Sequence, residues 1–111
     1  MKDNETHTNS ADFTHEVKGN YTLKVTGDLT IQVTGKMTLK SDGDATVQSS
    51  ASGTVKTGTG LTLQAGTDLT AKAGTGATLQ GGTTVEVKGS ASGTVDGGGM
   101  LTVKGGMVKI N

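Results

Sequence analysis

The sequence predicts an all-β fold, an intertwined trimeric triple-stranded β-helix (triangular prism) built from octad repeats. Three observations lead to this prediction. The chain repeats every eight residues without a gap, apolar and polar residues alternate within each repeat, and large apolar residues are few. A chain of this kind builds its core by repetition, with the apolar side of each unit buried against neighbouring units or chains.

Two columns of residues define the repeat. Eleven complete units run from Val17 to Lys104, and the first three read VKGNYTLK, VTGDLTIQ and VTGKMTLK. The sixth position is Thr in ten units and Glu86 in the other, while the seventh position is apolar in all eleven. When the frame is extended toward the N-terminus, Thr6 and Thr14 join the Thr column. The repeat is therefore expected to begin before Val17.

Three parts of the chain follow from this frame. Residues 1–16 form a polar N-terminal lead-in that carries early octads. Residues 17–104 form the octad-repeat shaft, and residues 105–111, which lack the Thr column, form a C-terminal tip.

Each unit combines one short strand with one bend. Positions five to eight read apolar, Thr, apolar, polar, which is the period-two pattern of a half-buried strand. The third and fourth positions hold residues that accept a left-handed backbone. These are Gly19, Gly27, Gly35 and Gly43 at the third position, and Asn20, Asp28, Asp44 and Asp68 at the fourth. We therefore expect a sharp, left-handed corner there.

Composition narrows the class of protein. The chain has 19 Gly, no Pro, no Trp, one Phe and one Tyr, and its net charge is zero. Low hydrophobicity with high net charge indicates disorder, but here the charges balance. There is no apolar run long enough for a membrane span and no signal-peptide segment. The absence of Arg and of a basic patch argues against nucleic-acid binding, and the absence of Cys excludes disulfides and thiol catalysis.

The residues at the eighth position of the octads predict how many sides the β-helix has. They are Lys24, Gln32, Lys40, Gln48, Lys56, Gln64, Lys72, Gln80, Lys88, Asp96 and Lys104. A coil of two units would stack Lys on Lys at about 4.8 Å, whereas a three-sided coil alternates Lys with the other residue. One chain or three chains satisfy this pattern. Because small residues such as Ala71 and Ala77 would leave a wide single-chain interior partly empty, we favour a homotrimer.

A family resemblance follows from the first octads. The units that carry it are Val17-Lys18-Gly19, Val25-Thr26-Gly27 and Val33-Thr34-Gly35. They resemble the valine-any-glycine octads of the triple-stranded β-helix in phage cell-puncturing tail spikes and in the VgrG spikes of type VI secretion systems. The terminal GGMVKIN is similar to the end of such spikes. From Ser41 onward the first-position Val gives way to smaller residues, so a uniform cross-section is not expected.

The resemblance implies a structural needle and no enzyme. Such a needle pierces the target membrane mechanically, as a rigid trimer carried by an upstream spike base or tail tube hub. A PAAR-type tip-capping protein (proline-alanine-alanine-arginine repeat) would bind its C-terminal end. The implied location is the bacterial cytoplasm, or a phage particle, during assembly and the extracellular space after firing.

Other functions share parts of the pattern. A passive trimeric stalk of an adhesin or tail fibre would use the same shaft without the sharp end. An ice-binding β-solenoid would also present Thr columns, but a three-sided path distributes one Thr per octad over three faces. The Gly-rich stretch TGTG lacks the Gly-Lys-Ser/Thr ending of a phosphate loop.

The sequence offers few residues for chemistry. Glu86 is the one carboxylate in the Thr column, and a solvated position beside Lys88 explains it without catalysis. His7 and His15 fall in the seventh column, so a trimer would place three imidazoles of each near its axis, as weak candidates for a metal site. No cofactor is expected. The candidate partner-binding tip consists of Met107, Val108, Lys109, Ile110 and Asn111.

Overall fold

The backbone changes direction every eight residues. The computed structural model describes residues 3–111. Bends lie at residues 10–11, 18–19, 26–27, 34–35, 42–43, 50–51, 58–59, 66–67, 74–75, 82–83, 90–91 and 106–107, and a turn lies at 98–99. In the octad frame these are always the second and third positions, so the spacing of the corners follows the spacing of the sequence repeat.

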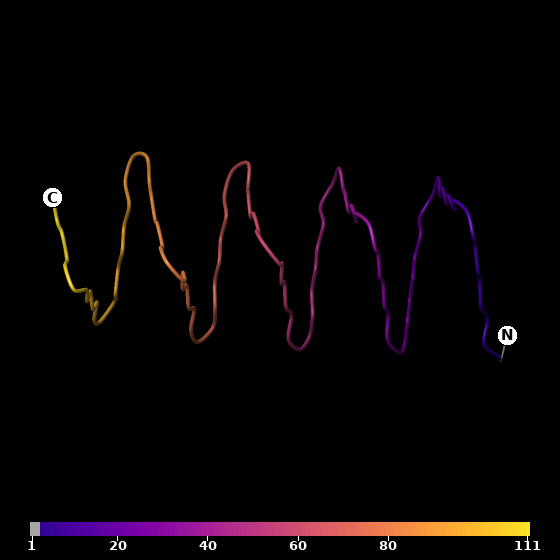
Figure 1. Ribbon diagram of the computed structural model, residues 1–111, viewed down its shortest axis with the longest axis horizontal. Coiled ribbons are helices and arrows are strands. Elements are labelled where there is room, and N and C mark those ends of the chain that lie inside the picture. The colour runs from indigo at the N-terminus through magenta and orange to yellow at the C-terminus, as the bar shows by residue number, and fades with distance from the viewer. Residues whose placement is uncertain (1–2) are drawn as a thin grey trace. The chain divides into compact units, whose positions relative to one another are not determined.

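The chain divides into two units, Met1–Gly53 and Thr54–Asn111. Within each unit, extended segments alternate with corners (Figure 1). In the part of each unit that lies within residues 3–111, Cα atoms twelve or more residues apart stay more than 8 Å from one another. Equivalent positions of octads that are two or more repeats apart therefore do not stack within a unit. The predicted boundaries after residues 16 and 104 stay predictions, and residues 1–2 of the lead-in lie outside the described residues.

The corners differ from the prediction in position and in backbone conformation. They lie one residue earlier than expected, at the second and third positions. Among residues 3–111, a positive φ occurs only at Gly98, where it is 64°. The left-handed corners predicted at Gly19, Gly27, Gly35 and Gly43 and at Asn20, Asp28, Asp44 and Asp68 are wrong. Two successive bends share the change of direction, so neither needs a left-handed backbone.

The predicted strands are extended segments without sheet partners. No residue from 3 to 111 is assigned to a strand or a helix. The one backbone–backbone hydrogen bond in this range runs from the Met100 amide to the Gly97 carbonyl, at 3.2 Å. A strand is defined by its ladder of hydrogen bonds to a neighbouring strand, and no segment of a unit lies beside another. Nothing in residues 3–111 forms a helix of the length and apolarity needed to span a membrane.

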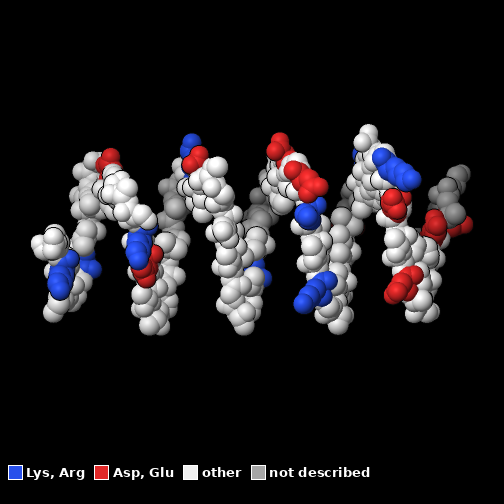
Figure 2. Space-filling view, turned by 90° about the horizontal axis from the view of Figure 1, so that it is seen from above, with Lys and Arg blue, Asp and Glu red and all other residues white. Residues whose placement is uncertain are grey.

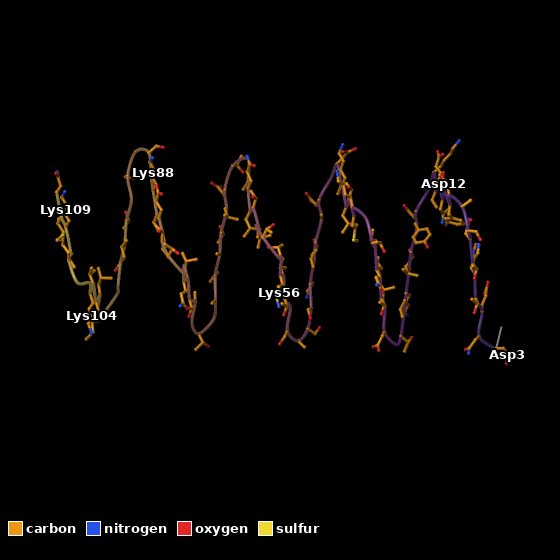
Figure 3. The ribbon with its side chains drawn as sticks, viewed as in Figure 1. Asp3, Asp12, Lys56, Lys88, Lys104 and Lys109 are labelled. Carbon is orange, nitrogen blue, oxygen red and sulfur yellow. The ribbon has the colours of Figure 1, made fainter. Side chains whose placement is uncertain are left out.

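The chain exposes far more surface than a folded monomer does. Its accessible surface is 12893 Å². A folded monomer of 11.1 kDa exposes about 5,700 Å², and the unfolded chain about 16,000 Å². All described residues are exposed, and none of them forms a buried core. Side chains project from the whole length of the ribbon (Figure 3).

Candidate functional site

Apolar side chains of the fifth and seventh positions form the largest candidate interaction surface. In the seventh column Val47 is fully exposed and Leu39 is 87% exposed. The fifth column is also open to solvent, with Leu29 at 59% and Leu69 at 66%. Isolated exposed apolar residues are common on proteins, but apolar residues that recur at the same octad positions within each unit are typical of a surface that binds another polypeptide.

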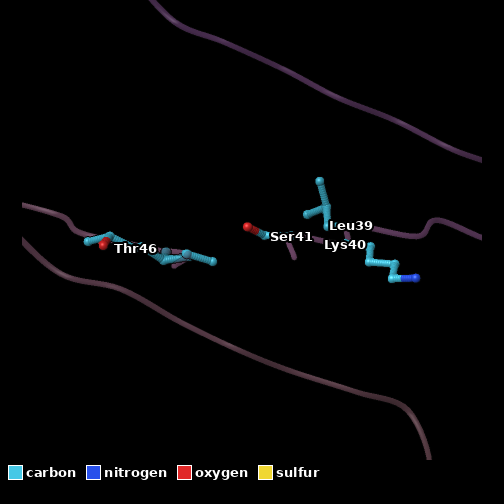
Figure 4. A pocket seen from close by; sticks show the side chains of 6 residues that line it. Leu39, Lys40, Ser41 and Thr46 are labelled. Atoms are coloured by element: carbon cyan, nitrogen blue, oxygen red, sulfur yellow. The ribbon is translucent and has the colours of Figure 1, made fainter. Parts of the chain in front are cut away.

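One corner of the chain brings residues of two neighbouring octads around a shared hollow. In the unit Met1–Gly53, a hollow of about 350 Å³ is lined by Leu39, Lys40, Ser41, Ala45, Thr46 and Val47. Figure 4 shows the side chains of Leu39 and Lys40 extending to opposite sides of the backbone. This is the alternation that the period-two pattern predicted. At this pair the apolar side chain and the Lys side chain therefore lie on different sides of the backbone.

Polar side chains at the first position hold several corners. The Ser41 and Ser49 hydroxyls each donate a hydrogen bond of 3.2 Å to the carbonyl of the fourth residue, Asp44 and Ser52. The Asn9 side chain bonds the Asp12 carbonyl in the same way, at 3.3 Å. Such local side-chain bonds are typical of Asn and Ser in turns. The sequence analysis missed this role, although a polar residue directly before a bend was the signal for it.

Glycine at the first position gives a tighter form of the same corner. A Cβ atom at Gly81, Gly89 or Gly97 would overlap the carbonyl oxygen of the residue three positions later. In the Ser49 unit the carbonyl of the fourth residue accepts a side-chain hydrogen bond. In these three units the equivalent carbonyl occupies the space that a Cβ atom would need. The Gly97 corner is further closed by the amide of Gly98, which donates a 2.8 Å hydrogen bond to Oδ1 of Asp96. These corners require Gly because of close approach.

The third-position glycines have no such reason within the chain. At Gly19, Gly27, Gly35 and Gly43 an added Cβ would meet nothing within 4 Å. Their φ values are also compatible with other residues, because Gly98 alone has a positive φ in residues 3–111. Neither the corner nor a neighbouring part of the same chain explains these four glycines.

His7 and His15 belong to a ladder of aromatic rings. His7 and Phe13 are 5.5 Å apart between ring centroids, Phe13 and His15 are 6.3 Å apart, and His15 and Tyr21 are 5.3 Å apart. All three pairs are edge-to-face, the geometry preferred by aromatic rings. Phe13 thus separates the two histidines along the ladder. Within residues 3–111 of this chain, no three His, Cys, Asp or Glu side chains are grouped to hold a metal ion.

The tip carries three exposed apolar residues. Met107 and Ile110 are 87% and 88% exposed, and Val108 is 51% exposed. A bend at residues 106–107 precedes them, and Lys109 projects from the last segment of the ribbon (Figure 3). These side chains follow one another on a short segment.

Charged residues do not gather into a site on the face shown in Figure 2. They form small separate groups of both signs, and uncharged residues make up most of that surface. Glu86, the exception in the Thr column, is exposed like its neighbours. This distribution offers no concentrated field for a charged substrate.

Comparison with known proteins gives one family match. The model of the Gp5 C-terminal repeat matches the chain in three copies, at residues 3–22. These 20 residues, counted from 3 to 22, are less than a fifth of the 111-residue chain. No curated protein and no solved structure matches the chain. The match supports a needle-like repeat of the phage and VgrG type, and it suggests a β-helix.

Proposed function

We propose that this chain is the shaft and tip of a membrane-piercing needle, acting as a homotrimer in a contractile injection machine of the type VI secretion or phage tail kind. The exposed apolar columns carry the proposal. The accessible surface of 12893 Å² exceeds that of a folded monomer by about 7,000 Å². Burial against copies of the same chain removes that excess.

Three copies also satisfy the backbone. The extended segments of one chain leave their amides and carbonyls without backbone partners, and buried backbone groups need such partners. In a trimer, the two edges of each segment would pair with segments of the other two chains. A neighbouring chain crossing close to the corner would also explain Gly19, Gly27, Gly35 and Gly43, where this chain leaves open space.

The needle works mechanically. A closed prism has no long free sheet edge, so a force applied at its base is shared by many cross-chain hydrogen bonds. The proposal gives no residue a catalytic role, because the repeat is built mainly of Thr, Gly and aliphatic residues and offers few acids, bases or nucleophiles in a shared position. Assembly takes place in the cytoplasm or in a phage particle, and firing carries the needle out of the cell.

Solution mass tests the assembly. Light scattering of the purified chain is expected to give three times the 11.1 kDa chain mass, without a folded monomer on dilution. A folded, stable monomer would contradict the trimer and return the single-chain solenoid as the better explanation.

Cap binding tests the tip, and it separates a needle from a passive stalk. Deleting residues 107–111 is expected to leave a soluble trimer that no longer co-purifies with a PAAR-type capping protein encoded with it. Ile110→Asp should have the same effect, whereas Thr94→Asp, which adds the same charge on the shaft, should bind the cap normally. Equal cap binding by the truncated and full chains would refute the docking role and favour the stalk.

A further inference from the structure

A regular octad repeat leaves the alignment of identical chains poorly specified. Because ten of eleven units carry Thr at the sixth position and all carry an apolar residue at the seventh, a chain shifted by whole units still matches column to column. The Lys column alternates with period two, so it disfavours a shift of one unit but accepts a shift of two. A repeat of this kind needs a non-repeating element to fix its register.

The aromatic ladder is such an element. The chain has one Phe, one Tyr and two His, and all four lie between residues 7 and 21. Their rings form a continuous edge-to-face series within one unit. The corresponding fifth and seventh positions farther along the chain hold aliphatic residues or Gly, among them Leu29, Met37 and Leu61, and no aromatic ring.

The ladder is also available to other chains. Phe13 is 63% exposed and Tyr21 is 61% exposed, although both rings already contact a histidine. His7, Asn9 and Phe13 line a hollow of about 230 Å³ on this side of the chain. The ladder therefore has open ring surface beside a space that side chains of a second copy can fill.

We propose that the ladder formed by His7, Phe13, His15 and Tyr21 sets the axial register of the three chains, by packing against its own copies. This inference rests on the proposed homotrimer. A shift of two units would place the rings of one chain against Leu and Met side chains of its neighbours. Rings and aliphatic chains differ in volume and in preferred contact geometry, so a close-packed interior rejects the mismatch.

Distances between spin labels report the register. The chain has no Cys, so Thr38→Cys provides one labelling site per chain, on the polar side. Three chains in register place the labels at the corners of an equilateral triangle and give one narrow distance distribution by double electron–electron resonance. A shifted chain adds further distances.

Phe13→Leu together with Tyr21→Leu is expected to keep the trimer mass but broaden the distribution into several distances. The matched control changes Leu61 and Leu69 to Ala, at fifth positions 48 residues farther on. It removes more apolar volume from the same column and should keep a single distance. A single distance in the aromatic variant, with the trimer retained, would overturn the inference and leave the proposed trimer intact. A monomeric parent chain would instead refute the trimer itself.

A transplanted ladder decides the outcome if the aromatic variant fails to assemble. Leu61→Phe, Leu63→His and Leu69→Tyr reproduce the spacing of Phe13, His15 and Tyr21, and they are added to the aromatic variant. We expect the transplant to restore a trimer with a single label distance. Failure to restore it would show that the rings are needed only for local structure near the N-terminus, and the inference would be wrong.

Discussion

The corner at Ser49 and the corner at Gly97 turn the chain at the same octad positions by different means. At Ser49 a side-chain hydroxyl reaches the carbonyl of Ser52 at 3.2 Å. At Gly97 the corresponding carbonyl, that of Met100, occupies the space of a missing Cβ, and its amide closes a turn onto Gly97. The comparison teaches that the eight-residue period does not depend on one kind of corner.

Both regions share the exposed apolar seventh column. A charged substitution in this column should have the largest effect on assembly. Val47→Asp or Val87→Asp would place three carboxylates together in the interior of the proposed trimer. An uncompensated buried charge costs about 3–5 kcal/mol per chain, so neither variant should assemble. Thr46→Asp, at the sixth position that the octad pattern assigns to the outside of the trimer, should change the free energy of unfolding by about 0.5 kcal/mol or less. Light scattering and thermal melting at fixed chain concentration measure both effects.

Comparable damage from Val47→Asp and Thr46→Asp would mean that the apolar column does not face the interior. Assembly of Val47→Asp with failure of Val87→Asp would mean that only the later octads form the trimer. In that case the two regions would differ in function as well as in the construction of their corners.

The second effect comes from exchanging one type of corner for the other. Gly97→Ser places at this corner the residue type that Ser49 provides at the other corner, but the added Cβ would overlap the Met100 carbonyl. Overpacking of this kind costs about 1–3 kcal/mol, so the melting temperature of the assembly should fall. Gly99→Ser is the control, since an added Cβ there meets nothing within 4 Å. If both substitutions melt alike, close approach is not the reason for Gly97.

The third effect isolates backbone conformation from space. Gly98 and Gly58 occupy the second position of their octads, and an added Cβ meets nothing at either, but only Gly98 has a positive φ. Gly98→Ala should cost about 1–2 kcal/mol. Gly58→Ala should be neutral or stabilising by about 0.4–1 kcal/mol, because Ala reduces the entropy of the unfolded chain. Equal melting shifts for the two variants would contradict the left-handed assignment at Gly98.

The spacing of the corners could be predicted from the sequence, because the Thr and apolar columns repeat without insertion from Val17 to Lys104. The backbone conformation of the corners could not be predicted. Gly and Asp at the third and fourth positions permit a left-handed backbone but do not require one. The chain distributes each bend over two residues whose φ values are negative, except at Gly98. Gly98, the one residue between 3 and 111 with a left-handed backbone, lies in a GGG run where the pattern gives no preference among the three glycines.

The candidate site was predictable to a similar extent. The seventh column and the tip residues followed from periodicity and from the loss of the Thr column. The ladder of rings could not be predicted in this way. Edge-to-face contact across a corner depends on the angle of that corner, and the eight-residue period does not determine this angle. The Ser41 and Ser49 hydrogen bonds depend on the same angle, since it brings the fourth carbonyl within reach of the first side chain.

The smallest expected effect tests the side-chain form of the corner directly. Ser49→Ala removes the hydrogen bond to the Ser52 carbonyl and the 3.3 Å bond that Ser49 Oγ accepts from the Ala51 amide. Both bonds are exposed, so water replaces them in part, and the loss should be about 0.5–1 kcal/mol per chain. Ser50→Ala, one residue away and outside this pair of bonds, is the matched control and should be nearly neutral. Thermal melting at fixed concentration resolves the difference, because three copies multiply it per assembly. A Ser49→Ala variant as stable as Ser50→Ala would show that the bends alone hold this corner, and the Ser49 and Gly97 regions would then differ only in how closely the carbonyl approaches.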